Sequence, residues 1–188
     1  EVARPQRASA AGCGTGSNLW FLAREGFQAF GIDSSPSAIA AAKARMEAEG
    51  LPVSLRVGSF SELPWPDQHF DLAVDRAALT CVGRSVVRKA FDELHRTLKP
   101  GAALLFNCYS AAHGSRLTGA PGEDGLTVEI TGGTLKGAGH IRFYSLPDVH
   151  DALGEGFAVE SCRHLLEADP SLPQEQVHAE WRVVARRK

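Results

Sequence analysis

Short apolar runs and helix-spaced apolar positions alternate along the first half of the chain. Strands are predicted where apolar residues run together, over 7–11, 27–32, 53–57, 70–75 and 102–108. Helices are predicted where apolar residues recur with helical spacing, over 17–25, 36–49 and 85–98. This alternation predicts an α/β protein built on a mostly parallel sheet.

The helices over 36–49 and 85–98 have clear boundary signals. Ser35 is placed to cap the first of them, Pro36 suits its first position and Gly50 can end it. The sequence Lys-Pro-Gly at 99–101 is expected to stop the second helix before the strand over 102–108 begins.

The second half of the chain carries a different pattern. Alternating residues predict two strands over 126–130 and 140–144, with glycine-rich turns between them. A short helix is predicted over 146–153. Two closing strands, over 157–166 and 177–186, follow each other without a helix, so we expect them to pair antiparallel.

Length and composition indicate one soluble globular unit. The 188 residues suit a single domain, and 44% apolar with 22% charged residues is typical of folded proteins. The formal charge of −2 provides no basic footprint for nucleic acid, and no apolar stretch suits a membrane span or a signal peptide. The four cysteines lack the spacing of zinc ligands, so we expect no metal and predict free thiols in the cytoplasm.

A glycine turn between a predicted strand and a predicted helix is the strongest chemical signal. Residues 12–16 read Gly-Cys-Gly-Thr-Gly, which lets a ligand approach the backbone at the amino end of a helix. The dinucleotide fingerprint GxGxxG would require glycine at Ser17, so the spacing here is GxGxG. Asp33 follows the next strand, where its carboxylate could accept from both hydroxyls of a ribose. An adenosine-containing ligand fits, although the glycines alone could make a tight turn and Asp33 could cap the next helix.

Four segments carry a resemblance to a known family. The chain resembles the class I S-adenosylmethionine-dependent methyltransferases in the runs GCGTGSNLWFLAREGFQAFGIDSSPSAI, LPWPDQHFDLAVDRAAL, ELHRTLKPGAALLF and RFYSLPDVHDALGEGFAVES. Their order and spacing cover nearly the whole chain. The resemblance implies a Rossmann-like three-layer sandwich, with a seven-stranded, mostly parallel sheet of order 3-2-1-4-5-7-6 in which strand 7 is antiparallel.

The resemblance also implies a cofactor, S-adenosyl-L-methionine, and its product S-adenosyl-L-homocysteine. The glycine turn would face the methionine part, Asp33 would hold the ribose, and the residues after the third strand would lie beside the adenine. The implied cofactor-binding residues are Gly12, Cys13, Gly14, Gly16, Asp33, Ser34, Ser59, Phe60 and Asp75.

Two positions depart from the family pattern. The acidic residue that usually stands two positions before the first glycine is Ala10 here, and Ser59 stands where aspartate is common. Serine offers adenine one hydroxyl and no charge. Either a partly degenerate protein binds the cofactor weakly, or other residues compensate.

Methyl transfer depends on positioning and exclusion of water more than on a catalytic base, because the donor is already activated. The catalytic candidates near the predicted site are Asp75, Arg76, Tyr109 and His113. Asp75 and Arg76 could instead form a structural ion pair. Tyr109 could be a wall of the pocket, and His113 a solvated loop residue. The run over 75–79 also resembles the fourth-strand motif of thiopurine and thiol methyltransferases. Methylation of a sulfur acceptor is therefore an alternative to methylation at oxygen, nitrogen or carbon.

We predict a cytoplasmic methyltransferase that acts on a small-molecule acceptor, without a nucleic-acid or membrane partner and as either a monomer or a homodimer. A non-catalytic cofactor-binding protein of the same fold would explain Ala10 and Ser59. A nicotinamide-dependent oxidoreductase would share the glycine turn and the ribose acid. It should also show GxGxxG and a Tyr-x-x-x-Lys dyad, and the sequence contains neither.

The predicted single domain over 1–188 has two parts. Residues 1–108 are expected to form the cofactor half, and residues 109–188 the acceptor half with a hairpin insertion. Few residues precede the first predicted strand, whereas the family generally has an N-terminal segment that covers the cofactor. We therefore expect either a fragment or a chain without this lid.

Overall fold

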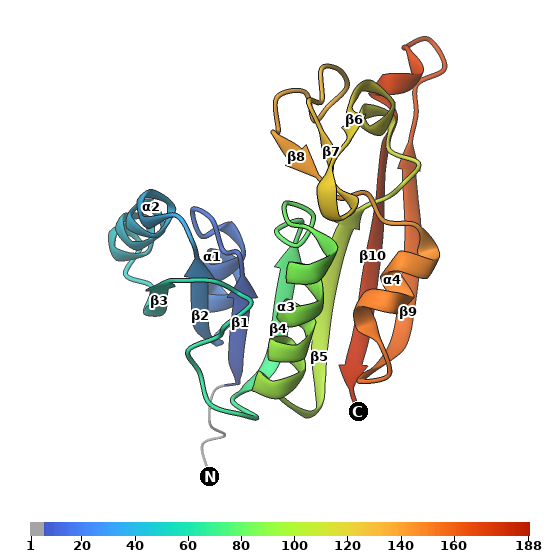
Figure 1. The fold of residues 1–188 in the computed structure, drawn as a ribbon. Coiled ribbons are helices and arrows are strands. Elements are labelled where there is room, and N and C mark those ends of the chain that lie inside the picture. The colour runs from blue at the N-terminus through green and yellow to red at the C-terminus, as the bar shows by residue number, and fades with distance from the viewer. Residues whose placement is uncertain (1–5) are drawn as a thin grey trace.

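The computed structural model describes residues 6–188, which form a sheet with helices on both faces (Figure 1). Seven strands form the sheet in the order β3-β2-β1-β4-β5-β10-β9. Their bounds are β1 Arg7–Ala11, β2 Gln28–Asp33, β3 Val53–Val57, β4 Phe70–Arg76, β5 Leu98–Tyr109, β9 Phe157–Glu167 and β10 His178–Arg187. The first five strands in this order, β3, β2, β1, β4 and β5, pair in parallel, and β10 pairs antiparallel with both β5 and β9. The predicted Rossmann-like order with an antiparallel closing strand is confirmed.

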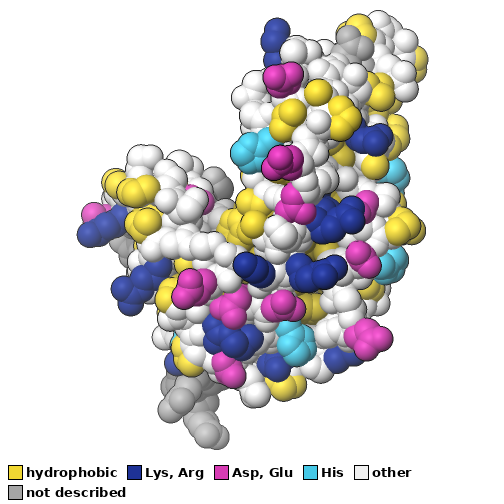
Figure 2. All heavy atoms as spheres, in the orientation of Figure 1, with side chains coloured by type: hydrophobic (Ala, Val, Ile, Leu, Met, Phe, Trp, Pro, Cys, Tyr) yellow, Lys and Arg dark blue, Asp and Glu magenta, His cyan; other side chains and the backbone are white. Residues whose placement is uncertain are grey.

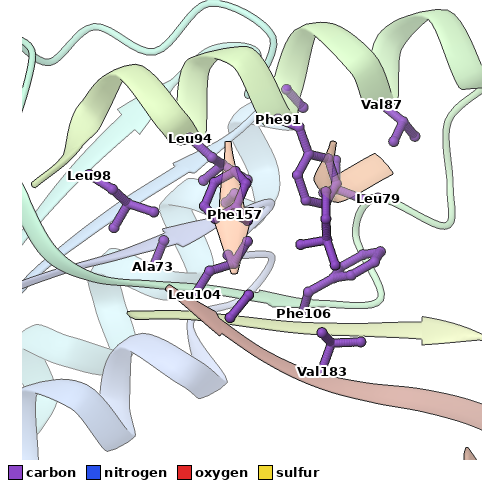
Figure 3. Packing of buried hydrophobic residues seen from close by; sticks show 14 of the residues in the cluster. Ala73, Leu79, Val87, Phe91, Leu94, Leu98, Leu104, Phe106, Phe157 and Val183 are labelled. Atoms are coloured by element: carbon purple, nitrogen blue, oxygen red, sulfur yellow. The ribbon is translucent and has the colours of Figure 1, made fainter. Parts of the chain in front are cut away.

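The helices divide between the two faces of the sheet. The α-helices are α1 Ser17–Arg24, α2 Pro36–Ala48, α3 Arg84–Thr97 and α4 Leu146–Leu153, and short 3-10 helices follow β5 and precede β10: η1 Gly114–Thr118, η2 Glu123–Gly125 and η3 Gln174–Gln176. One buried cluster joins α1 and α2 to β1 and β2. A larger one joins α3 and α4 to β4, β5 and β10. Figure 3 shows Phe91 and Leu94 of α3 above Phe106 and Leu104 of β5, all at most 4% exposed.

The predicted boundaries of α2 are confirmed. The Ser35 hydroxyl accepts a hydrogen bond from the N–H of Ala38 at 3.2 Å, and Pro36 occupies the first turn. Gly50 follows the helix with a φ of +65°. These local signals place the end of β2 and the start of α2 on either side of a short turn.

Strand β5 begins earlier than the predicted residue 102. It starts at Leu98, directly after α3, and Leu98 pairs with Phe70 before the register shifts. Gly101 has a φ of +77°. The segment over 99–101 therefore ends the helix as predicted, but it forms an irregular start to the strand instead of a separate turn.

The predicted strands over 126–130 and 140–144 are wrong in extent. Only β7 (Thr127–Val128) and β8 (His140–Ile141) are strand, and they join β6 (Ala120–Pro121) in a separate three-stranded sheet. Glu129 has a φ of +54°, which ends β7 because extended backbone needs negative φ. Residues 142–144 leave β8 for the interior, where each is at most 8% exposed.

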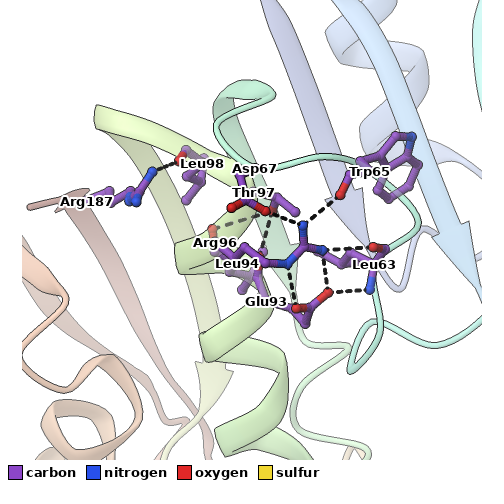
Figure 4. Close-up of polar contacts among 9 residues, drawn as sticks. All are labelled: Leu63, Trp65, Asp67, Glu93, Leu94, Arg96, Thr97, Leu98 and Arg187. Atoms are coloured by element: carbon purple, nitrogen blue, oxygen red, sulfur yellow. Dashed lines mark hydrogen bonds and ion pairs between the residues drawn. The ribbon is translucent and has the colours of Figure 1, made fainter.

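Arg96, near the end of α3, joins this helix to the loop between β3 and β4 (Figure 4). Its guanidinium donates to the carbonyl oxygens of Leu63 and Trp65, each at 2.9 Å, and to Asp67 Oδ1 at 2.9 Å. It also donates to both oxygens of Glu93, at 2.7 and 2.8 Å. Because the Glu93 carboxylate also accepts from the N–H of Leu63 at 2.7 Å, the loop is held to α3 at several points.

Replacing Arg96 by lysine is expected to lower the free energy of unfolding by about 1–3 kcal/mol, because an ammonium cannot reproduce the planar fork of donors. Urea unfolding measures the change. Arg88→Lys is the matched control, since exposed Arg88 on the same helix has no hydrogen bond or ion pair within residues 6–188. It should change stability by less than about 0.5 kcal/mol. Equal losses in the two variants would contradict this role of the network.

Candidate functional site

The turn after β1 has the backbone shape that glycine favours. Gly12 and Gly14 have φ of +62° and +53°. A Cβ on Gly12 would lie 2.2 Å from the Cβ of Ala78, so this glycine also lets the loop after β4 approach. Cys13 lies between them and is 6% exposed. Burial, and then the charge of Asp33, raise the pKa of its thiol to about 12, so Cys13 is a neutral structural residue near pH 7.

The amino end of α1 faces the same turn. The helix begins at Ser17 with Gly16 as its N-cap, and no side chain within the described chain caps it. Its first N–H groups therefore keep free donor capacity and a positive partial charge. An anionic group such as a carboxylate can bind there.

Asp33 ties the glycine turn to the start of α2. Its Oδ2 accepts from the N–H of Gly14 at 2.8 Å, and its Oδ1 accepts from the N–H of Ser35 at 2.9 Å. Because a carboxylate has about four acceptor positions, each oxygen can accept a further hydroxyl. The two backbone donors fix the direction in which the carboxylate points.

The residues predicted beside the ribose and adenine lie at the adjoining ends of β2 and β3. Ser34 and Ser59 are exposed, and the Ser59 hydroxyl lies 2.7 Å from that of Ser61. Phe60 is half-buried, and its Cε1 is 3.6 Å from where a Cβ on Gly12 would lie. The structure therefore brings Phe60 to the glycine turn.

A cleft of about 570 Å³ opens where β1, β4 and β5 end, beside the start of α1. In Figure 2 the molecule is hollowed between its α2 end and the end that carries β6 to β8. Of the predicted residues, five line the cleft: Gly12, Cys13, Gly14, Arg76 and Tyr109. The other lining residues come mainly from the start of α1 and from β5 and β10: Thr15, Ser17, Asn18, Ala77, Asn107, Cys108, His178, Glu180 and Arg182.

Strand β10 supplies cleft residues that the sequence analysis missed. In register, Glu180 pairs with Tyr109 and Arg182 pairs with Asn107, so their side chains share one face of the sheet. Glu180 forms an ion pair with Arg182 at 2.5 Å, and its second oxygen lies 3.8 Å from His178 Nε2. The sequence did contain a signal for these residues. In the closing strand predicted over 177–186, every second residue at its start is polar: His178, Glu180 and Arg182. An antiparallel strand starts at the sheet edge where the parallel strands end, so these side chains could have been expected near the cleft.

Asp75 and Arg76 point to opposite faces of the sheet. Arg76 is exposed in the cleft, whereas Asp75 is 1% exposed and pairs in register with buried Phe106. Successive strand residues alternate between faces, which explains the difference. Asp75 does not line the cleft, and no ion pair joins it to Arg76 within residues 6–188. The structure therefore places only Arg76 where an acceptor could touch it.

His113 is buried against Tyr109 and His178, two residues that line the cleft, and is not a solvated loop residue. It is 1% exposed, and its Nδ1 accepts from the N–H of Ser115 at 3.2 Å. Nε2, which then carries the proton, lies 3.2 Å from the hydroxyl oxygen of Thr134. Burial, and then the neighbouring His178, lower the pKa of His113 to about 4. The ring is neutral near pH 7 and supports Tyr109, whose centroid is 5.4 Å away.

Tyr109 is half-buried in the wall of the cleft, and burial raises the pKa of its hydroxyl. Its ring also meets that of His178 edge-on at 6.0 Å between centroids. Ala10 does not line the cleft and is 1% exposed within the cluster under α1. The position where the family usually has an acid therefore offers no polar side chain here.

The arrangement suits S-adenosylmethionine on three counts. The glycine turn leaves the backbone open at Gly14, Asp33 offers directed acceptors for a ribose, and the uncapped end of α1 offers donors for a carboxylate. The residues present therefore fit the cofactor. No helix between residues 6 and 188 is long and apolar enough to cross a membrane. The same stretch contains no group of three or more His, Cys, Asp or Glu side chains that could hold a metal.

Comparisons with known proteins agree with this geometry. A family model described as a methyltransferase domain matches residues 10–101. A putative methyltransferase of Geobacillus sp. strain WCH70 is 31% identical over 105 residues, which are 53% of this chain and 40% of that protein. The chain spans about two fifths of the length of the curated relatives it matches.

Two solved structures have the same fold. A SAM-dependent methyltransferase from Methanosarcina mazei superposes with a TM-score of 0.81 at 22% identity, covering 99% of this chain and 94% of that one. A protein solved in connection with the conversion of a disulfide bond into a thioacetal group during echinomycin biosynthesis superposes with a TM-score of 0.73 at 25% identity. The match covers 98% of this chain and 77% of that chain.

Proposed function

Because this chain belongs to the class I S-adenosylmethionine-dependent methyltransferases, we propose that it transfers a methyl group from S-adenosylmethionine to a small-molecule acceptor. The observation that carries the proposal is the cleft, which joins the glycine turn to polar side chains from β4, β5 and β10. The bound cofactor supplies an activated methyl group. The chain's own residues bind the donor, orient the acceptor and exclude water.

On the donor side, the glycine turn, Asp33 and Phe60 hold the adenosyl part, and the start of α1 receives the carboxylate. On the acceptor side, Arg76, Tyr109 and His178 meet the substrate. A volume of about 570 Å³ suits a small molecule. On the face seen in Figure 2, Lys and Arg side chains are interspersed with Asp and Glu side chains, so that face offers no continuous basic surface for nucleic acid.

A sulfur acceptor is the second candidate. The resemblance of residues 75–79 to thiol methyltransferases favours it, and so does the fold neighbour linked to the conversion of a disulfide bond into a thioacetal group. A thiolate is already a good nucleophile, which suits a cleft whose carboxylate, Glu180, is paired with Arg182. Incubating the protein with methyl-labelled S-adenosylmethionine and a metabolite extract, then identifying the labelled products, distinguishes S-methylation from O-, N- or C-methylation. Absence of labelled product would favour a non-catalytic cofactor-binding protein.

Asp33→Asn is expected to weaken S-adenosylhomocysteine binding at least tenfold by calorimetric titration. The amide replaces one acceptor oxygen by a donor, so a ribose hydroxyl or one of the two backbone N–H groups loses its partner. Asp151→Asn removes the same charge from an exposed position on α4 and should bind like the wild type. Wild-type protein that binds nicotinamide dinucleotides but not S-adenosylhomocysteine would overturn the proposal in favour of an oxidoreductase.

A further inference from the structure

The loop between β4 and α3 forms a wall of the cofactor site. Its Ala78 lies against Gly12, where a Cβ would come within 2.2 Å of it. Ala77 has a φ of +63°, a left-handed conformation that alanine rarely adopts, and it also lines the cleft. A loop in such a conformation persists only when its surroundings hold it. The contacts that hold it therefore help to shape the site.

The second half of the chain holds this loop from outside. The Tyr144 hydroxyl donates to the carbonyl oxygen of Leu79 at 2.8 Å. The backbone N–H of Arg142 donates to the carbonyl oxygen of Thr80 at 2.7 Å. Leu79 and Thr80 are fully buried. Each bond fixes one backbone carbonyl, so the loop cannot move as a unit without breaking both.

Asp75 holds the loop from inside. Its Oδ1 accepts from the N–H of Leu79 at 3.1 Å, whereas its Oδ2 has no partner within the described chain. The side chain is 1% exposed. A buried polar oxygen without a partner is rare and costly, and far more so when it carries charge.

Between residues 6 and 188, no cation pairs with Asp75 or lowers its pKa. The charge of Asp75 acts on three titratable groups, Cys108 on β5, Cys81 in the loop and Tyr144 before α4, and the pKa of each is raised mainly by burial. The guanidinium of Arg142 pairs instead with Asp148 at 3.0 Å. Burial raises the pKa of Asp75 itself to about 8, outweighing the backbone hydrogen bond from Leu79.

We propose that Asp75 is a positioning residue of the cofactor site and that its protonated form holds the loop over 77–82 against the glycine turn. This inference rests on the proposed function. When Asp75 ionises, the charge can be solvated only if the loop opens and admits water. Ala78 then leaves Gly12, and the cofactor loses one wall of its site. Cofactor affinity therefore falls as the pH rises through the titration of Asp75.

The test measures the dissociation constant of S-adenosylhomocysteine by calorimetry from pH 6 to 9.5. In wild-type protein we expect nearly constant affinity up to pH 7 and at least fivefold weaker binding at pH 9.5. Asp75→Asn keeps the size and a carbonyl acceptor for Leu79 but cannot ionise. Titration of the ligand's own amino group affects every variant equally, and once it is subtracted the affinity of Asp75→Asn should change less than twofold between pH 6 and 9.5.

Two controls separate this role from general stability. The first control is Asp71→Asn. Asp71 lies at the other end of β4 and pairs with Lys99, so this variant should bind S-adenosylhomocysteine with the wild-type pH dependence. Tyr144→Phe removes the bond to Leu79 and should weaken binding at every pH while keeping the fall above pH 8. Should Asp75→Asn not fold, ¹³C-NMR of labelled aspartate carboxyls in the wild type should still reveal one group titrating near pH 8.

Two results would overturn the inference while leaving the proposed function intact. One is wild-type binding that is as strong at pH 9.5 as at pH 7. The other is an Asp75→Asn profile with the same slope as the wild type. Absence of S-adenosylhomocysteine binding by the wild type at pH 7 would instead remove the proposed function, and this inference with it.

Discussion

Replacing Gly12 by alanine is expected to destabilise the protein by about 2–4 kcal/mol and to weaken S-adenosylhomocysteine binding at least tenfold. Part of the cost is the left-handed backbone of residue 12, which costs a side chain roughly 1–2 kcal/mol. The rest is overpacking, because the new Cβ would lie 2.2 Å from that of Ala78. Urea unfolding and calorimetric titration measure the two effects separately.

Two further variants divide these causes. Gly26→Ala also places alanine at a positive φ, +85°, but with nothing within 4 Å of the new Cβ. It should cost only the conformational part, about 1–2 kcal/mol, and leave cofactor binding unchanged. Adding Ala78→Gly to Gly12→Ala removes the clashing atom and should restore part of the stability and affinity. If the double variant were no better than Gly12→Ala, the contact between the two residues would not be the cause.

Asp75 should make wild-type stability fall between pH 6.5 and pH 8. Its pKa is about 8 in the folded protein, against 3.8 ordinarily, so across this window the folded state binds a proton that the unfolded state has lost. The stabilisation is complete below the unfolded pKa and is lost as the pH rises through the folded one. The expected loss is about 1.5–2 kcal/mol in the free energy of unfolding, measured by urea unfolding at several pH values.

The window begins at pH 6.5 because His113 acts in the opposite sense below it. Its pKa is lowered from 6.5 to about 4 in the folded protein, so the unfolded state binds more protons there and stability rises with pH. Between pH 4 and 6.5 the contributions of His113 and Asp75 have opposite signs and largely cancel in the wild type. Asp75→Asn should therefore abolish the fall between pH 6.5 and 8 and uncover a rise in stability between pH 4 and 6.5. An equal fall in wild type and variant would show that another group is responsible.

Strong local patterns explain which parts of the fold were predictable. The cap at Ser35, the glycines after β1 and the apolar runs of β2 to β4 each depend on neighbours in the chain, so their elements were placed within a residue or two. The strands over 126–130 and 140–144 failed because alternation alone did not reveal the positive φ of Glu129 or the burial of Arg142. There, contacts with the loop after β4 overrode the local pattern.

By itself, the sequence determined the order of strands and helices, the glycine turn and the position of Asp33 at the end of β2, because these follow from spacing along one chain. Only the tertiary structure decided which polar residues share the cleft. Asp75 and Arg76 are neighbours in sequence, yet one lies buried under the loop after β4 while the other faces solvent. His178 and Glu180 reach the cleft because β10 pairs antiparallel with β5, which brings residues about 70 positions from Tyr109 beside it. Burial and long-range pairing depend on which element covers which face, and no short stretch of sequence contains that information.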